Sequence, residues 1–102
     1  MARSKYEGVI EAVRYSKDNK INEVRMYETR RLVFSDRIVI DRAELVKRLE
    51  KGKRIVTGRR KVSWGNDFET GQRVLLRDGK TPFISTEDLA GEKEYLTGVP
   101  VF

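Results

Sequence analysis

Basic side chains are concentrated in one stretch of this 102-residue chain, between residues 47 and 61. Eight positions in that stretch are lysine or arginine, and Glu50 is the one acid among them. The basic residues are Lys47, Arg48, Lys51, Lys53, Arg54, Arg59, Arg60 and Lys61. Such a stretch could bind a polyanion, and we expect RNA or DNA. A second interpretation stays open, in which these side chains form a solvated face and those near residue 50 complement a helix dipole.

Trp64 follows the basic stretch and could supply an aromatic surface for stacking. Proteins that bind single strands combine cationic side chains with rings on which bases stack. Phe68 lies in the segment 65–71 (GNDFETG), which the sequence predicts to be a surface loop. Because exposed aromatic residues also mark protein-partner sites, an alternative function remains. In that alternative the chain is a protein-interaction or accessory domain that uses Trp64, Phe68 and the edge strand beside Pro82.

Cysteine and histidine are both absent from the sequence, and their absence removes several classes of chemistry. Neither the usual zinc sites nor the Ser-His-Asp and Cys-His catalytic arrangements can be built. The glycines are scattered and match neither the dinucleotide-binding nor the P-loop pattern. Asp67 and Glu69 could touch a divalent ion, but they do not resemble an EF-hand loop. We therefore expect a binding module and not an enzyme, with no cofactor and no metal site.

The segment from Asp41 to Gly52 predicts one α-helix, over about residues 41–51. Asp41 is a suitable N-cap because its carboxylate can accept hydrogen bonds from unpaired N–H groups at the helix start. Glu44 completes the spacing of a capping box, and Gly52 stands where a left-handed residue would end the helix. A narrow apolar stripe would face the core. It consists of Leu45, Val46 and Leu49.

Short runs of β-branched and aromatic residues on both sides of this helix predict strands. The runs cover residues 5–15, 21–29, 32–34, 38–40, 54–57, 72–77 and 81–85. Polar residues 16–20 and the Asp78-Gly79 dipeptide predict hairpin turns, and Pro82 predicts that the last strand lies at an edge. Strands in hairpin order around one helix predict an α+β fold: a small, partly open barrel or a curled, mostly antiparallel sheet of about six strands.

Length and composition predict a single domain over residues 1–102 with a basic surface, because the formal net charge is +6. The sequence has no apolar run of ~18 residues that could span a membrane, and the first eight residues have no hydrophobic segment of the signal-peptide type. The lack of cysteine fits a reducing compartment. We therefore expect a cytoplasmic protein without membrane contact, whose partner is RNA or DNA or, alternatively, another protein.

Overall fold

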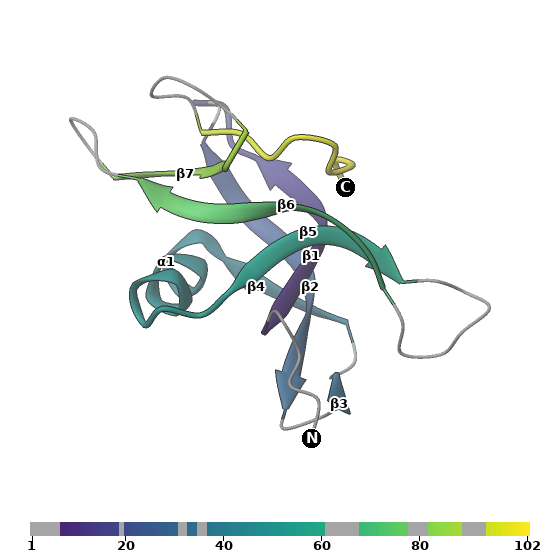
Figure 1. Cartoon of the computed structure of the whole chain (residues 1–102). Helices are drawn as coiled ribbons and strands as arrows, with labels where there is room; N and C mark the ends of the chain where they lie inside the picture. The colour runs from purple at the N-terminus through teal and green to yellow at the C-terminus, as the bar shows by residue number, and fades with distance from the viewer. Residues whose placement is uncertain are drawn as a thin grey trace.

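The computed structural model describes residues 7–18, 20–30, 33–34, 37–60, 68–77, 82–88 and 94–102, with the main chain alone described at 29–30, 33–34, 60 and 68–69. These residues form seven strands and one helix, an α+β arrangement (Figure 1). In chain order the elements are β1 (Gly8–Tyr15), β2 (Ile21–Arg30), β3 (Val33–Phe34), β4 (Ile38–Asp41), α1 (Arg42–Glu50), β5 (Ile55–Arg60), β6 (Phe68–Arg77) and β7 (Phe83–Thr86).

The described strands form one mixed sheet that curls without closing into a barrel, which confirms the curled-sheet version of the predicted fold (Figure 1). Neighbouring strands follow the order β3-β2-β1-β5-β6-β7, and β4 pairs with β2 beside this path. The β1–β5 pair is parallel, whereas the other pairs of named strands are antiparallel. A parallel pair requires a long crossover connection, and here the chain from β2 through α1 provides it.

The helix is confirmed close to its predicted bounds. Asp41 Oδ1 accepts a hydrogen bond from the N–H of Glu44 at 2.9 Å, and Gly52 has a φ of +81°, the left-handed value expected after a helix. Leu45 is fully buried, and Val46 and Leu49 pack against the core from the side. The main core cluster consists of Ile10, Val13, Ile21, Val24, Met26, Leu45, Ile55, Val74, Ile84 and Leu96.

A β-bulge at Glu11 lets β1 bury side chains on both sides of the break. Ile10 pairs with Met26 and Ala12 pairs with Arg25, so Glu11 is the extra residue between two consecutive pairs. Ile10 and Val13 consequently both enter the main core, although their sequence separation would place them on opposite faces of a regular strand. The bulge also sets the Glu11 side chain at the edge of the region described below as the candidate site.

The predicted loop over residues 65–71 is wrong in its second half, because Phe68 begins β6 and Gly71 lies inside that strand. Gly71 is needed for close approach and not for a turn. A Cβ at residue 71 would lie 2.7 Å from Thr57 Oγ1. That oxygen accepts a hydrogen bond from the N–H of Gln72 at 3.0 Å. Likewise the strand predicted over residues 54–57 is longer in the structure, where β5 continues to Arg60.

The C-terminal segment, residues 94–102, packs back onto the sheet. Leu96 is fully buried, and its N–H donates a hydrogen bond to the Tyr15 hydroxyl at 3.1 Å. The Tyr15 and Tyr95 rings are stacked, with centroids 6.0 Å apart. Farther along, Val101 forms a parallel bridge with Val13. The end of the chain therefore lies beside the second half of β1.

Candidate nucleic-acid interface

Five of the predicted basic residues lie around the C-terminal end of α1 and the turn into β5. We call Lys47, Arg48, Lys51, Lys53 and Arg54 the helix-end group. All except Arg48 are exposed. Lys51 is the C-cap residue, and Lys47 and Arg48 are in the last helical turn, so these positive charges lie next to the negative end of the helix dipole.

Acidic side chains are interspersed through the helix-end group. Lys47 Nζ lies 3.9 Å from a Glu44 carboxylate oxygen, and Lys53 Nζ lies 3.5 Å from one of Glu7. Arg48 is the most constrained, because its guanidinium contacts Glu28 at 3.0 Å and Glu44 at 2.9 Å. The hydrogen bond to Glu28 is the main reason that the pKa of Arg48 is raised above its ordinary value. This arrangement favours a structural role for Arg48.

Arg59 lies at the other end of β5 from the helix-end group. Arg54 and Arg59 are five positions apart, which is roughly 16 Å along a strand. The predicted basic residues whose side chains are described are therefore divided between two places on the molecule and do not form one compact patch. For Arg60 and Phe68 only the strand main chain is described, and Lys61 and Trp64, like Asp67, lie outside the described residues.

Three further arginines lie near the C-terminal segment, in a group that we call the arginine cluster: Arg14, Arg25 and Arg37. The guanidinium carbons of Arg14 and Arg25 lie 4.6 and 5.1 Å from the centre of the Phe102 ring, within the range of cation–π contacts. Arg14 also donates a hydrogen bond to the main-chain oxygen of Phe102 at 3.2 Å and contacts Glu23 at 3.1 Å. Arg14 and Arg37 remain about half exposed, at 49% and 53%.

Glu11, the bulge residue of β1, holds two members of the arginine cluster together. Its Oε1 atom lies 3.0 Å from Arg25 Nε and 2.6 Å from Arg37 Nε. Neither contact has the alignment of a hydrogen bond, so both are ion pairs. Arg37 Nε also donates to the Tyr27 hydroxyl at 3.3 Å, and this hydrogen bond is the main cause of the raised pKa of Arg37.

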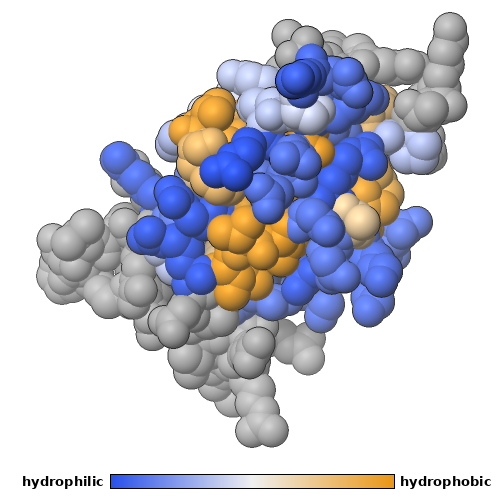
Figure 2. Space-filling view, turned by 180° about the vertical axis from the view of Figure 1, so that it is seen from behind, coloured by the Kyte–Doolittle hydropathy of each residue, from blue (hydrophilic) through white to orange (hydrophobic). Residues whose placement is uncertain are grey.

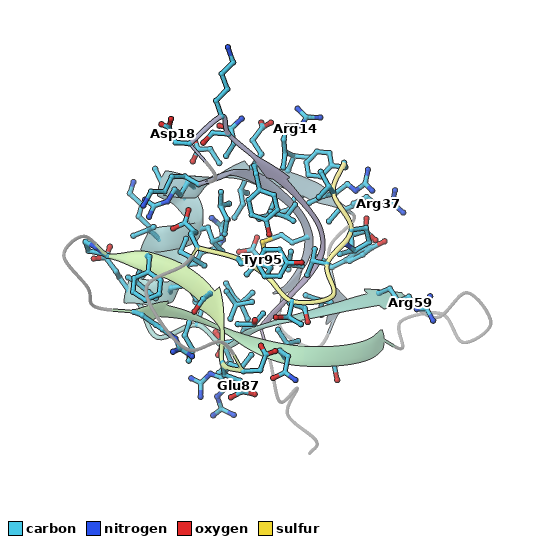
Figure 3. The ribbon with its side chains drawn as sticks, turned by 90° about the horizontal axis from the view of Figure 1, so that it is seen from above. Arg14, Asp18, Arg37, Arg59, Glu87 and Tyr95 are labelled. Carbon is cyan, nitrogen blue, oxygen red and sulfur yellow. The ribbon has the colours of Figure 1, made fainter. Side chains whose placement is uncertain are left out.

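Glu11 and Arg59 both line one pocket of about 350 Å³. This pocket therefore lies between Arg59 and the carboxylate that holds Arg25 and Arg37. Figure 3 shows Arg14, Arg37 and Arg59 along the same side of the molecule, outside the C-terminal segment. They come from three separate places in the sequence: β1, the residue before β4, and β5. Arg59 is among the basic residues predicted from the sequence, whereas the three residues of the arginine cluster are not. An arginine within or next to a strand gives no local signal that long-range pairing will bring it to a site.

The surfaces of the alternative, protein-binding interpretation are partly described. β7 lies at one end of the sheet, as Pro82 predicted, but its four residues are buried. Part of its outer edge is occupied, since the N–H of Thr86 donates to the main-chain oxygen of Tyr95 at 3.2 Å. Among described residues the exposed large hydrophobic side chains are Val39, Tyr95 and Val101. On the rear face the hydrophobic atoms are divided by hydrophilic ones (Figure 2).

Two other features are absent from the described part of the chain: a membrane-spanning helix and a cluster of potential metal ligands. No helix there is long and apolar enough to cross a membrane. The same residues contain no group of three carboxylates that could hold a metal ion. Comparison of the sequence and the structure with protein-family models, curated proteins and solved structures finds no match.

Proposed function

We propose that this protein is a non-catalytic module that binds RNA or DNA, and that the arginine cluster together with Arg59 forms the main contact with phosphates. The observation that supports this proposal is the gathering of three arginines around Glu11 and Phe102, with Arg59 on the pocket that Glu11 also lines. Among the described side chains, the acids that contact the three residues of the arginine cluster are Glu11 and Glu23.

The helix-end group is a weaker candidate for the same role. Its five bases lie among Glu7, Glu28, Glu44 and Glu50, which leaves little net positive charge there. Arginine is also better suited than lysine to phosphate oxygens, because its planar guanidinium can donate two parallel hydrogen bonds. We therefore assign Lys47, Lys51, Lys53 and Arg54 a long-range electrostatic contribution, and Arg48 a structural one.

The test is a salt titration of oligonucleotide binding by the whole chain. For single strands, log K falls against log salt with a slope of roughly −0.7 per phosphate contact. The double variant Arg14→Gln/Arg59→Gln should flatten this slope by about 1.4, because two contacts are lost. The matched control, Lys47→Gln/Lys51→Gln, removes the same charge from the helix-end group and should leave the slope nearly unchanged.

Equal effects of the two double variants would mean that the net charge matters and the arginine cluster does not. Absence of binding to either strand type at ~100 μM protein and low salt, where non-specific binding is strongest, would refute the proposal altogether. The protein-interaction function, with Trp64 and Phe68 as its contact residues, would then become the leading hypothesis.

A further inference from the structure

The pocket between Glu11 and Arg59 occupies the place where the sheet divides. β1 and β5 run parallel and pair over Gly8–Ile10 and Ile55–Thr57. Beyond these residues β5 continues beside β6, whereas β1 pairs with the C-terminal segment through Val13 and Val101. The strands therefore separate in the direction of their carboxyl ends, the position at which parallel strands of other folds form ligand crevices.

Both the walls and the rim of this pocket carry groups suited to a nucleotide. Thr70, Gln72 and Thr97 supply hydroxyl and amide groups, which can donate as well as accept hydrogen bonds. Val99 and Pro100 supply an apolar wall, and Arg59 supplies a cation. A nucleobase has the matching features: flat apolar faces, an edge with donors and acceptors, and a phosphate on each side in a strand.

The size and charge of the pocket restrict the ligand further. A volume of about 350 Å³ is at the small end of the range for ligand sites, which begins at roughly 300 Å³. Glu11 is neutralised by its contacts with Arg25 and Arg37, so its carboxylate does not repel a phosphate held by Arg59. The pocket thus has room for one nucleotide, with the Arg59 cation among its lining residues.

We propose that this pocket receives one unpaired base of a single strand whose flanking phosphates contact Arg59 and Arg37, an inference that rests on the proposed function. A base in a duplex cannot enter, because it is stacked and paired. Single strands can turn a base outward and present its edge to protein side chains. Bound in this way, the protein discriminates single strands from duplexes by access to the pocket and not by charge.

The experiment compares two DNA strands of about ten nucleotides, a length within the range of single-strand sites. One strand carries all its bases, and the other carries abasic residues throughout with the same number of phosphates. The wild-type protein should bind the complete strand about 5- to 140-fold more tightly, which corresponds to two hydrogen bonds to the base edge at about 0.5–1.5 kcal/mol each and 1.4 kcal/mol per tenfold change. Thr70→Phe, which places a ring in the pocket from an exposed strand position, should bring this ratio close to one.

Thr70→Ser is the matched control, because it keeps the hydroxyl and adds no volume, and it should keep the ratio of the wild type. A second measurement needs no variant: NMR amide shifts of Gly71, Gln72 and Gly98 in the wild-type protein. These amides should move with the complete strand and stay in place with the abasic strand.

Two negative results are distinguishable. Equal affinities of the wild type for both strands, with a strong salt dependence, would overturn the pocket assignment and leave phosphate binding by the arginines intact. Binding of neither strand would overturn both proposals. Amide shifts that appear near Arg14 and Phe102 without any at the pocket would also overturn the pocket assignment, whether or not Thr70→Phe folds.

Discussion

Replacement of Glu94 by alanine should destabilise this protein more than other replacements of a single acid. The Glu94 side chain is 1% exposed and contacts three separate parts of the fold. Its carboxylate accepts hydrogen bonds from the N–H groups of Ile21 at 2.6 Å and Ile84 at 3.0 Å. Arg42 of α1 contacts it at 2.9 Å. One side chain therefore joins the start of β2, strand β7 and the helix.

The size of the effect follows from what the truncation leaves behind. Each of the two buried N–H groups left without a partner costs about 1–3 kcal/mol, whereas Arg42, whose side chain is 34% exposed, can be solvated after its partner is removed. Because the two N–H groups share one carboxylate and their contributions are not additive, we expect Glu94→Ala to lower the free energy of unfolding by about 2–5 kcal/mol. Glu94→Gln keeps one acceptor oxygen and should lose less.

Chemical denaturation monitored by circular dichroism gives this difference directly. Glu23→Ala is the control, since Glu23 forms an ion pair with Arg14 at the surface, where such pairs contribute about 0–1 kcal/mol. A loss below about 1 kcal/mol for Glu94→Ala, no larger than that of an exposed pair, would show that the carboxylate does not hold these three elements together.

The pH dependence of stability provides an independent check on Glu94. Burial by itself would raise the pKa of this carboxyl, but hydrogen bonds from Arg42, Ile84 and Ile21 outweigh it, and the pKa is lowered. The unfolded chain, with a pKa of about 4.3, therefore takes up the proton first as the pH falls. The stabilisation is complete above about pH 5 and is lost as the pH falls through the folded-state pKa. Glu94→Gln should show a smaller loss of stability between neutral and acidic pH than the wild type. An equal loss in both proteins would contradict this assignment.

Two further predictions test the helix. Leu45→Ala should lower the free energy of unfolding by about 2–5 kcal/mol, because Leu45 is fully buried, and Leu49→Ala should lower it by less because that side chain is only partly buried. The reverse order in a denaturant titration would mean that α1 is rotated on the sheet. Asp41→Ala should cost about 1 kcal/mol through loss of the hydrogen bond to the N–H of Glu44. Here Asp41→Asn is the control, because asparagine caps nearly as well, and an unchanged melting temperature for Asp41→Ala would argue against the cap.

The candidate site was predictable only in part. The basic stretch is a concentration of charge along the sequence, and Arg59 belongs to the region that we propose to contact phosphates. Whether charges in a sequence reinforce each other depends on which acids lie opposite them. Glu28 reaches Arg48 from β2, and Glu7 reaches Lys53 from the start of β1. Neither acid lies within the basic stretch, so the sequence of that stretch does not show that Arg48 and Lys53 are paired with acids.

Features governed by neighbours along the chain were determined by the sequence itself. Asp41 and Gly52 mark the ends of α1 because capping involves residues only a few positions apart. Val24 and Met26 face the core as the alternation of β2 predicts. The loop prediction at Phe68 failed because it relied on local residues. Gly65 and Gly71 give a turn signal, whereas Gly71 is required by its close approach to Thr57 on another strand.

Only the tertiary structure decided how distant segments combine. The parallel pairing of β1 with β5, the bulge at Glu11 and the return of residues 94–102 all depend on packing of a shared core. Together they gather the arginine cluster around Glu11 and place Glu11 and Arg59 on one pocket where the two strands separate. The reason is physical: capping and strand alternation are short-range effects. The position of a charge in space is fixed by hydrophobic contacts between residues far apart in sequence. The amino-acid sequence alone does not show which of those contacts form.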